Sequence, residues 1–317
     1  MSRTIDVVGV PSSMGAFAPG QERAPSALRA AELVERLRTA GADVRDHGDG
    51  AARRWSPDRE HPFAQHVGPV RDVALETAAR VADVDGDLSL VLGGDCTIEL
   101  GTLAGLQARL DGRIGLVYFD LHADMNTPST VRWGALDSMG MAHALGDDLA
   151  APALAKAFAR TPLLQPDELW LFGLGHGQDH ERERIAALDI DRTPVEDVVA
   201  DPPAAAERAL GVLEQRVDHL AVHLDLDVID FVDLPLQENV DRNEGLSFDA
   251  TMAALGTLLA HRAVVSLTIC ELNPDHDPDG SAVPRFVEGL VGALSREPAA
   301  AGSGDDVDLG APRSSSR

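Results

Sequence analysis

The chain has 317 residues, of which 44% are apolar and 25% are charged, and this ordinary globular composition excludes wholesale disorder and fibrous or collagen-like structure. Its 52 acidic residues against 27 basic ones give a formal net charge of −25, which disfavours nucleic acid and anionic membrane surfaces as partners. Residues 1–13 lack the features of a signal peptide, and no apolar run is long enough to span a membrane, so we expect a cytoplasmic protein. The two cysteines cannot form a disulfide framework.

Short apolar runs rich in β-branched residues alternate with segments of helical periodicity. The runs predict buried strands at 5–10, 89–92, 114–119, 169–174, 220–224 and 264–269. The periodic segments predict helices at 24–40, 70–84, 97–110, 203–217 and 249–261. This alternation is typical of a three-layer α/β fold (α-β-α), in which helices cover both faces of a central, mainly parallel sheet. We predict one domain over residues 1–296 and a disordered tail over 297–317, which is small and polar without an apolar period.

Two of the predicted strands, 114–119 and 220–224, are each followed by a cluster of ionisable residues. These residues are Asp120, His122, Asp124, Asp225, Asp227 and Asp230. Ligands bind beyond the carboxyl ends of strands in such sheets, and unpaired buried charges are strongly unfavourable. Any one of these aspartates could instead cap a helix or make a turn. Two such clusters together predict a metal site, and carboxylates with one imidazole suit Mn²⁺ or a similar cation.

Two further strand ends carry unusual residues. Gly93 and Gly94 permit a tight turn that leads to Cys96 and then to a helix. The strand at 264–269 leads to Glu271, a single carboxylate, while Cys270 beside it reads as a core residue.

These motifs, in this order, resemble the arginase-like ureohydrolases, a family of binuclear manganese amidinohydrolases. The resemblance extends from Ile5 to about Leu294. It rests on Gly9-Val10-Pro11, the segment from Gly20 to Pro25 with Leu28 and Arg29, Gly93-Gly94-Asp95, Asp120-x-His122-x-Asp124 with Asn126-Thr127-Pro128, Asp225-x-Asp227-x-x-Asp230 and Glu271-x-Asn273-Pro274. It implies an arginase-like catalytic domain, two Mn²⁺ ions per chain, a small guanidino substrate and a homo-oligomer, either a trimer or a hexamer.

The resemblance also implies roles for individual residues. Asp120 and Asp225 would bridge the two ions, Asp124 would complete one site, and His122 with Asp227 would complete the other. The resemblance further implies that Glu271 holds the substrate guanidinium and that Asp124 helps to move a proton to the leaving amine. We interpret Asp230 as a residue that supports the site or the fold rather than as a metal ligand.

The chain departs from the family pattern at two positions near the site. Cys96 stands where the family usually has a histidine ligand, and it is either a thiolate ligand, which would admit a divalent metal other than manganese, or a protonated spectator. Asp137 stands where the family often has a histidine that shuttles protons. It could do so with a raised pKa, or it could cap the helix expected at 138–145.

The residues expected around the substrate also differ from those of true arginases. We place substrate contacts at Asn126, Trp133, His176 and Glu271, although His176 could equally be a solvated loop residue. Most groups that recognise an amino acid head are missing, so we expect a hydrolase that releases urea or a substituted urea from a guanidino compound other than L-arginine. N-hydroxyguanidino compounds are among these candidate substrates, since their altered basicity could suit an altered metal site. The alternatives are a formimino- or agmatine-type amidinohydrolase and a catalytically silent metal-binding homologue.

Overall fold

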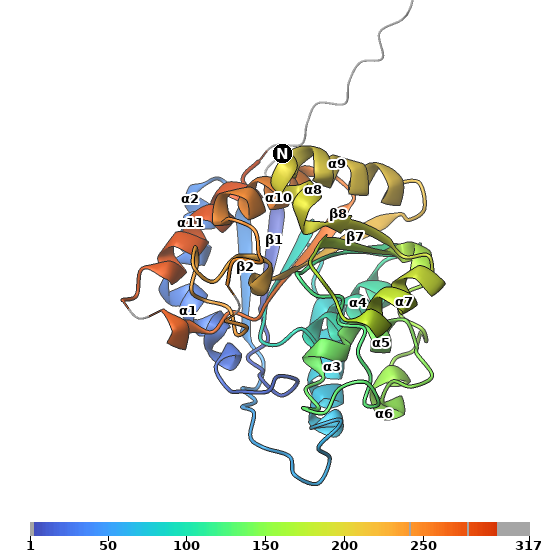
Figure 1. The fold of residues 1–317 in the computed structure, drawn as a ribbon. Helices are drawn as coiled ribbons and strands as arrows, with labels where there is room; N and C mark the ends of the chain where they lie inside the picture. The colour runs from blue at the N-terminus through green and yellow to red at the C-terminus, as the bar shows by residue number, and fades with distance from the viewer. Residues whose placement is uncertain (1–2, 241, 278, 297–317) are drawn as a thin grey trace, which may run out of the picture.

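The computed structural model describes residues 3–240, 242–277 and 279–296. Among these residues, eight strands form one sheet in the order β2-β1-β3-β8-β7-β4-β5-β6, and every neighbouring pair is parallel (Figure 1). The strands are β1 (Thr4–Gly9), β2 (Asp43–Asp49), β3 (Leu88–Leu92), β4 (Ile114–Phe119), β5 (Leu169–Leu174), β6 (Asp191–Pro194), β7 (His219–Asp225) and β8 (Val264–Cys270). The predicted α/β class is confirmed. The predicted tail at 297–317 lies outside the described residues.

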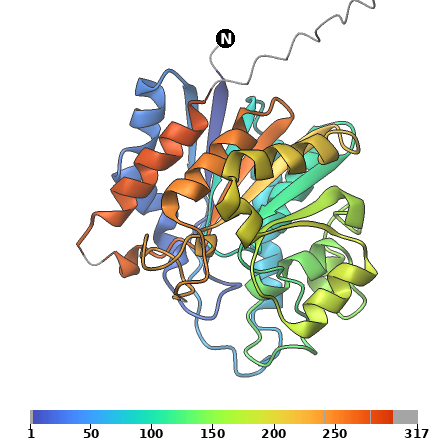
Figure 2. The ribbon, with the colours of Figure 1, turned by 45° about the horizontal axis from the view of Figure 1, so that its top comes forward.

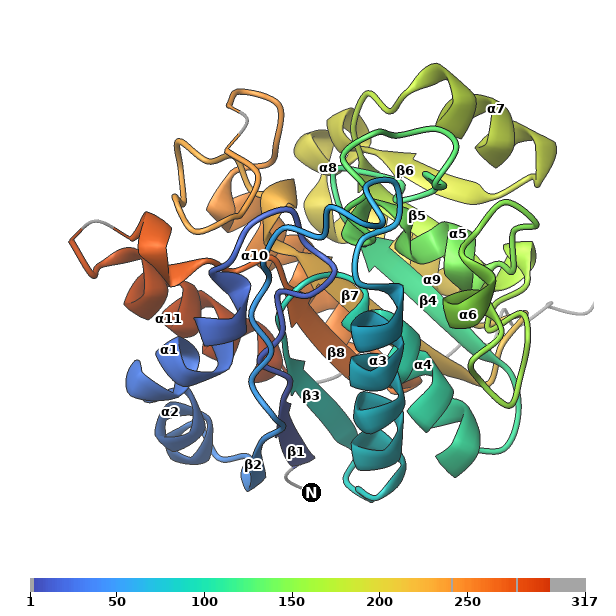
Figure 3. The ribbon, with the colours of Figure 1, turned by 90° about the horizontal axis from the view of Figure 1, so that it is seen from below.

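Helices cover both faces of the sheet. They are α1 (Ala24–Ala30), α2 (Leu33–Thr39), α3 (Val67–Ala82), α4 (Ile98–Arg109), α5 (Gly140–Ala144), α6 (Pro152–Ala155), α7 (Asp179–Ala187), α8 (Val195–Ala200), α9 (Pro202–Leu213), α10 (Phe248–Ala260) and α11 (Ala282–Leu294). Figure 3 shows α3 and α4 on one face and α1, α2 and α11 on the other, and Figure 2 shows α9, α10 and α11 side by side along that second face. No helix among the described residues is long and apolar enough to cross a membrane.

The strands are buried on both faces because helices pack on each. Successive residues of β1 show this, since Val7 belongs to the core beneath α1 and α2 while Val8 belongs to the core beneath α3 and α4. Every residue of β3 and β4 is buried. This explains why these strands read as continuous apolar runs rather than as alternating patterns.

The predicted helix at 24–40 is wrong, because the chain breaks there into α1 and α2. Glu32 lies between them with a φ of 66°, in the left-handed region that cannot continue a right-handed helix. The apolar period continues across the break, since Leu28 of α1 and Leu33 of α2 both reach the core. Periodicity alone therefore could not locate this break.

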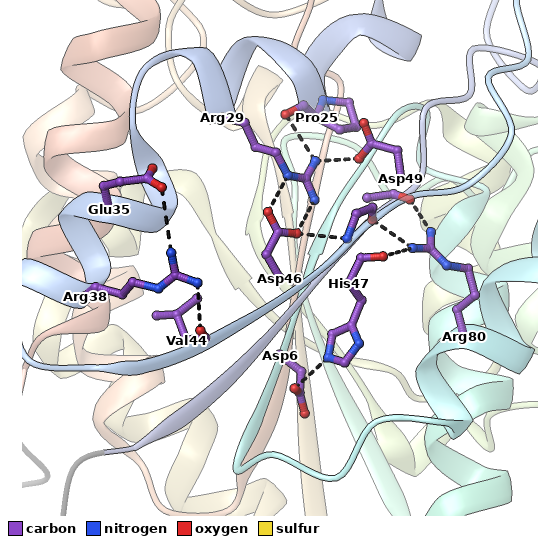
Figure 4. Close-up of polar contacts among 12 residues, drawn as sticks. Asp6, Pro25, Arg29, Glu35, Arg38, Val44, Asp46, His47, Asp49 and Arg80 are labelled. Atoms are coloured by element: carbon purple, nitrogen blue, oxygen red, sulfur yellow. Dashed lines mark hydrogen bonds and ion pairs between the residues drawn. The ribbon is translucent and has the colours of Figure 1, made fainter.

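The sequence predicted neither edge strand of the sheet, β2 or β6. In β2 only Val44 is buried, and the other positions carry mostly charged side chains (Figure 4). Arg29 of α1 donates hydrogen bonds of 2.9 and 2.8 Å to the two carboxylate oxygens of Asp46. Arg80 of α3 donates to the Gly48 carbonyl oxygen at 2.7 Å. Tertiary ion pairs and carbonyl contacts thus stabilise a strand that has no apolar pattern of its own.

The topology brings the four unusual strand ends together. β3, β8, β7 and β4 are consecutive in the centre of the sheet and run in the same direction, so their carboxyl ends share one edge. The turn after β3 is tight, because a Cβ at Gly94 would collide with the Ser12 carbonyl oxygen. The chain can therefore place Cys96 directly against the neighbouring strand ends.

Candidate metal centre and active site

A cavity of about 600 Å³ opens at the carboxyl edge of the central strands. Nearly all residues predicted for the site line it. They are Cys96, His122, Asp124, Asn126, Trp133, Asp137, His176, Asp225, Asp227 and Glu271. Asp120, the remaining predicted ligand, is buried next to them. Residues far apart in the sequence therefore meet in one cavity, as the four strand ends predicted.

The carboxylates at the ends of β4 and β7 form a compact cluster. One set of ligand atoms within 4.8 Å of one another belongs to Asp120, His122 and Asp227, and another to Cys96, Asp120, His223 and Asp225. Asp120 is common to both sets. A carboxylate has two oxygens, so Asp120 could contribute a ligand atom to either group.

Two buried carboxylate oxygens in this cluster have no hydrogen-bond partner among the described residues. They are Oδ2 of Asp120 and Oδ1 of Asp227, and the other oxygen of each residue is engaged. Oδ1 of Asp120 accepts the His122 backbone N–H at 2.6 Å. Buried carboxylate oxygens without partners are strongly unfavourable, and a divalent cation satisfies them. The cluster therefore fits a metal.

The electrostatics of the cluster lead to the same conclusion. Burial, reinforced by the charge of Asp227, raises the pKa of Asp120 to about 6. Burial and the neighbouring carboxylates also raise the pKa of Asp225 well above its usual value. The negative charge of Asp227 raises the pKa of His122 well above its usual range, and the two side chains lie 2.9 Å apart. The protein thus gathers more negative charge here than its one neighbouring imidazolium offsets.

Cys96 lies within the cluster rather than beside it. Its thiol donates to Oδ2 of Asp225 at 3.0 Å, and its side chain is fully buried. Burial raises the pKa of this thiol well above its usual value, with the Asp225 charge acting in the same direction. The thiol is therefore protonated in the metal-free protein, and only a bound cation could stabilise the thiolate.

Asp124 faces the cavity, but its carboxylate is already engaged. Its Oδ2 accepts the hydroxyl of Tyr118 at 2.5 Å, and its backbone φ is 48°. Asp124 belongs to neither set of ligand atoms. Burial and the charge of Asp120 raise its pKa well above the usual value. Each oxygen of Asp124 still has a lone pair that could face a cation, and its predicted role as a metal ligand stays a prediction.

Glu271 follows β8 and is held from two sides. Its Oε1 accepts a hydrogen bond from the backbone N–H of Cys96, and its Oε2 accepts one from Nε2 of Gln21, both at 3.0 Å. Its φ of 62° turns the backbone sharply at the strand end. Each carboxylate oxygen retains a free lone pair, so this fixed carboxylate can still accept two hydrogen bonds from a planar cation in the cavity.

Asp137 lines the cavity as the first residue of a short 3₁₀ helix, Asp137–Met139. The cap position is held by Leu136, so the prediction of Asp137 as an N-cap is wrong. The Asp137 carboxylate accepts the adjacent Ser138 N–H at 2.6 Å. Burial, with the charge of Asp95, raises the pKa of Asp137 well above its usual value.

The residues predicted to contact the substrate differ in whether their side chains are already engaged by other residues of the protein. Asn126 donates to Glu181 at 3.3 Å, while its amide oxygen lies 2.8 Å from Nε2 of His180, so most of its bonding capacity is used. Trp133 is 49% exposed at the rim of the cavity. His176 also lines this cavity.

Several residues around the site were not predicted. His223 and Tyr118 lie inside strands, Gln21 begins a short 3₁₀ helix, Gln21–Arg23, and Glu99 lies in the first turn of α4. His223 carried a usable signal, because it precedes Asp225 by two residues and so shares its face of the strand. Gln21 lies in the matched segment that begins at Gly20 but was given no role, and Tyr118 and Glu99 have no local pattern that points to a site.

A parallel α/β sheet with a shared-carboxylate cluster at the carboxyl ends of its central strands defines an enzyme fold with a candidate binuclear metal centre. The profile of the arginase family matches residues 3–291. The arginase of Bacillus caldovelox is 30% identical over 301 residues, covering 93% of this chain and 99% of the relative. The arginase of Bacillus subtilis strain 168 is 29% identical over 305 residues, covering 92% and 99%.

Solved structures agree with the sequence comparison. The structure of Bacillus caldovelox arginase at pH 5.6 matches with a TM-score of 0.81 and 27% identity, covering 93% of this chain and 99% of the other. Formimidoylglutamase from Bacillus subtilis, at 18% identity and a TM-score of 0.72 over 93% and 88% of the two chains, shares the fold. The chain belongs to the arginase family, whose members are metal-dependent hydrolases of carbon–nitrogen bonds in linear amidines.

Proposed function

We propose that this protein hydrolyses a carbon–nitrogen bond of a guanidino compound other than L-arginine, N-hydroxyguanidino compounds included, and releases urea or a substituted urea. The observation that carries this proposal is the meeting of a metal-fitting carboxylate cluster and a separately held carboxylate, Glu271, in one cavity. A cation site beside an oriented carboxylate is what hydrolysis of a guanidinium requires.

The cluster would hold two divalent cations, for which we propose Mn²⁺. Asp120 and Asp225 would lie between them, with His122 and Asp227 on one side and Cys96 and Asp124 on the other. When bound, such cations lower the pKa of water and so supply a nucleophile at neutral pH. The unpartnered oxygens of Asp120 and Asp227 support this assignment.

The side chains opposite the cluster would bind and orient the substrate. Glu271 would accept two hydrogen bonds from the guanidinium, because Cys96 N–H and Gln21 hold its carboxylate still. Asp137 lines the same cavity, and burial raises the pKa of its carboxyl, which is the direction that suits a proton donor. It would donate a proton to the leaving amine, with Asp124 as the second candidate for this transfer.

The outer part of the cavity argues against L-arginine as the preferred substrate. No described lining residue is Lys or Arg, so a carboxylate would find no cationic partner there. Asn126 is largely engaged by Glu181 and His180, and Trp133 presents an exposed aromatic face. The acidic lining residues Glu238 and Glu244 favour a cationic tail, so an agmatine-type substrate is the second candidate.

The test is a screen of L-arginine, Nω-hydroxy-L-arginine, agmatine and a formimino compound with the Mn²⁺-loaded protein, with urea or hydroxyurea identified by mass spectrometry. We expect kcat/KM for a hydroxyguanidine or for agmatine to exceed that for L-arginine. A preference for L-arginine would overturn the substrate proposal. Two bound ions without turnover of any compound would instead favour a silent metal-binding homologue. A homotrimer or homohexamer stays a prediction of the family resemblance, and a cytoplasmic location stays a prediction from the sequence.

A further inference from the structure

A buried histidine that is absent from the predicted ligand set lies inside the candidate metal centre. His223 is on β7, two residues before Asp225, and its side chain is completely buried. Its register neighbours are Tyr118 on β4 and Thr268 on β8. The imidazole stacks on the Tyr118 ring with 4.3 Å between centroids and 15° between planes. Packing therefore fixes the plane of the imidazole ring.

Both ring nitrogens of His223 have specific partners. Nδ1 lies 3.2 Å from Oε2 of Glu99, and Nε2 lies 3.2 Å from Sγ of Cys96. Glu99 is fully buried, and a carboxylate only accepts hydrogen bonds, so the Glu99 contact keeps the proton on Nδ1. Nε2 is then left with a lone pair directed at the cluster. Metal-bound histidines use the same arrangement, in which the ring nitrogen that does not bind the metal donates a hydrogen bond to a carboxylate.

The ligand atoms around Nε2 complete a coordination set. A ring nitrogen of His223, Sγ of Cys96 and carboxylate oxygens of Asp120 and Asp225 all lie within 4.8 Å of one another, and Nε2 is the nitrogen that lies 3.2 Å from Sγ. We propose that His223 is the imidazole ligand of the metal position on the Cys96 side, taking the place of the histidine that the loop after β3 lacks. Glu99 acts as its positioning residue. The assignment rests on the proposed metal-dependent function.

The alternative chemistry for this trio is a nucleophilic cysteine with a Cys96–His223–Glu99 arrangement. Its geometry is unfavourable, because the Cys96 thiol donates to Asp225 and a thiolate would face that carboxylate at 3.0 Å. A cation between the two groups removes the repulsion. Cys270 also lies close to Cys96 and His223, but its thiol points to the Asp95 carbonyl oxygen at 3.6 Å. We therefore leave Cys270 out of the ligand set.

The test measures metal binding directly, so its result does not depend on finding a substrate. Purified metal-free protein is titrated with Mn²⁺ by calorimetry, and bound metal is counted by elemental analysis. We expect two ions in the wild type and, in His223→Gln, loss of one ion or at least 100-fold weaker binding at one position. Glu99→Gln keeps the ring and should weaken the same position 10- to 100-fold. Mn²⁺ nitrogen couplings in electron-nuclear double resonance should report two bound imidazoles in the wild type and one in His223→Gln.

Matched controls separate ligation from folding. His143 is also buried, with Nδ1 2.7 Å from the Met139 carbonyl oxygen, but it lies away from the cluster, so His143→Gln should lower Tm and keep both ions. Cys270→Ala should keep both ions as well. The exchange Cys96→His with His223→Cys should retain two ions if both residues serve one position.

Two results would overturn the assignment. One is wild-type Mn²⁺ stoichiometry, affinity and nitrogen couplings in a folded His223→Gln protein. The other is rapid alkylation of Cys96 by iodoacetamide at the same rate with and without metal, which would identify the nucleophilic pair instead. Two ions bound through His223 without hydrolysis of any guanidino compound would sustain the ligand assignment and overturn only the proposed function.

Discussion

Glu271 shows how a single side chain can be oriented by contacts with a backbone group and with a side chain from distant parts of the sequence. Its two carboxylate oxygens are held by the Cys96 backbone and by Gln21, which come from the ends of different segments. The Gln21 amide oxygen is buried without a partner among the described residues. A flipped Gln21 amide could therefore accept a hydrogen bond from a glutamine at position 271, so the site should tolerate Glu271→Gln without collapse.

We predict that Glu271→Gln keeps both metal ions and loses roughly a hundredfold or more in kcat/KM, about 3 kcal/mol of transition-state stabilisation. The loss follows from replacing the charge that faces the guanidinium. Steady-state kinetics and elemental analysis of the same preparation provide the measurement. An unchanged kcat/KM would exclude the role of Glu271, and so would a loss of metal.

Asp225 and Asp230 lie close in sequence but differ in what they contact. Asp225 belongs to the cluster, whereas Asp230 accepts backbone N–H groups of Val232 and Glu244 and so closes a turn. We predict that Asp225→Ala removes metal and activity together. Asp230→Ala should keep both and lower stability by about 1 kcal/mol. Elemental analysis and thermal unfolding of the pair decide this, and two ions with full turnover in Asp225→Ala would show that the cluster is wrongly assigned.

The sequence predicted the residues of the site best where they follow strands. Asp120, Asp225 and Glu271 were found because parallel strand ends share an edge. His223 was left unassigned because a single histidine in an apolar run usually belongs to the core, although its spacing of two residues from Asp225 placed both side chains on one face of the strand. Gln21 and Glu99 act through contacts with residues distant in sequence, and no local pattern records such contacts.

At the scale of elements, α3 and α4 are in close contact on one face of the sheet. Gly105 of α4 makes this approach possible, because a Cβ there would lie 2.6 Å from the Ala78 carbonyl oxygen and 2.7 Å from Cβ of Val81 in α3. Gly292 of α11 is the contrasting case, an exposed helical glycine with no atom within 4 Å of its would-be Cβ. The two glycines therefore predict opposite effects of substitution.

We predict that Gly105→Val destabilises the fold by about 2 kcal/mol, since the two helices would have to separate. Gly292→Ala should stabilise it by up to about 1 kcal/mol through helix propensity alone. Chemical denaturation of both variants measures this. Equal effects of the two substitutions would mean that the contact between α3 and α4 is looser than described.

Some helices and strands could not be predicted from local sequence patterns. The central strands were predicted because burial on both faces favours mostly apolar residues, whereas β2 is polar and depends on Arg29 and Arg80. The division between α1 and α2 at Glu32 was missed because both helices keep the apolar period. Edge strands and helix breaks depend on partners that only the folded chain supplies.

For the whole molecule, the carboxylate cluster couples stability to pH and to metal. The ordinary pKa of Asp120 is 3.8, and in the folded chain it rises to about 6. Between these values the folded chain keeps a proton that the unfolded chain releases, so this group's stabilising contribution is lost as the pH rises from about 4 through 6. The opposite holds for His143, whose pKa burial lowers to about 4, so that it destabilises the fold as the pH falls below its ordinary value of 6.5.

We therefore predict that the Tm gained from Mn²⁺ grows as the pH rises from about 5 to about 8, because Mn²⁺ competes with protons for the cluster. Thermal unfolding in EDTA and in Mn²⁺ across this range is the measurement. Asp120→Asn provides the control, since the difference in metal-free stability between this variant and the wild type should change most between about pH 4 and 6. A metal-dependent gain in Tm that is equal at every pH would contradict the prediction.

The position of β8 in the sheet also determines the stage of translation at which the complete site can form. β8 lies between β3 and β7 in the sheet, yet it follows both in the chain. A nascent chain on the ribosome must hold β3 and β7 apart, with unpaired edges, until residues 264–271 emerge. The proposed metal ligands that follow β4 and β7 are therefore made well before the strand that completes their surroundings and leads to Glu271. Pairing across such long sequence separations is slow, so this enzyme should mature late and depend on protection of its growing chain.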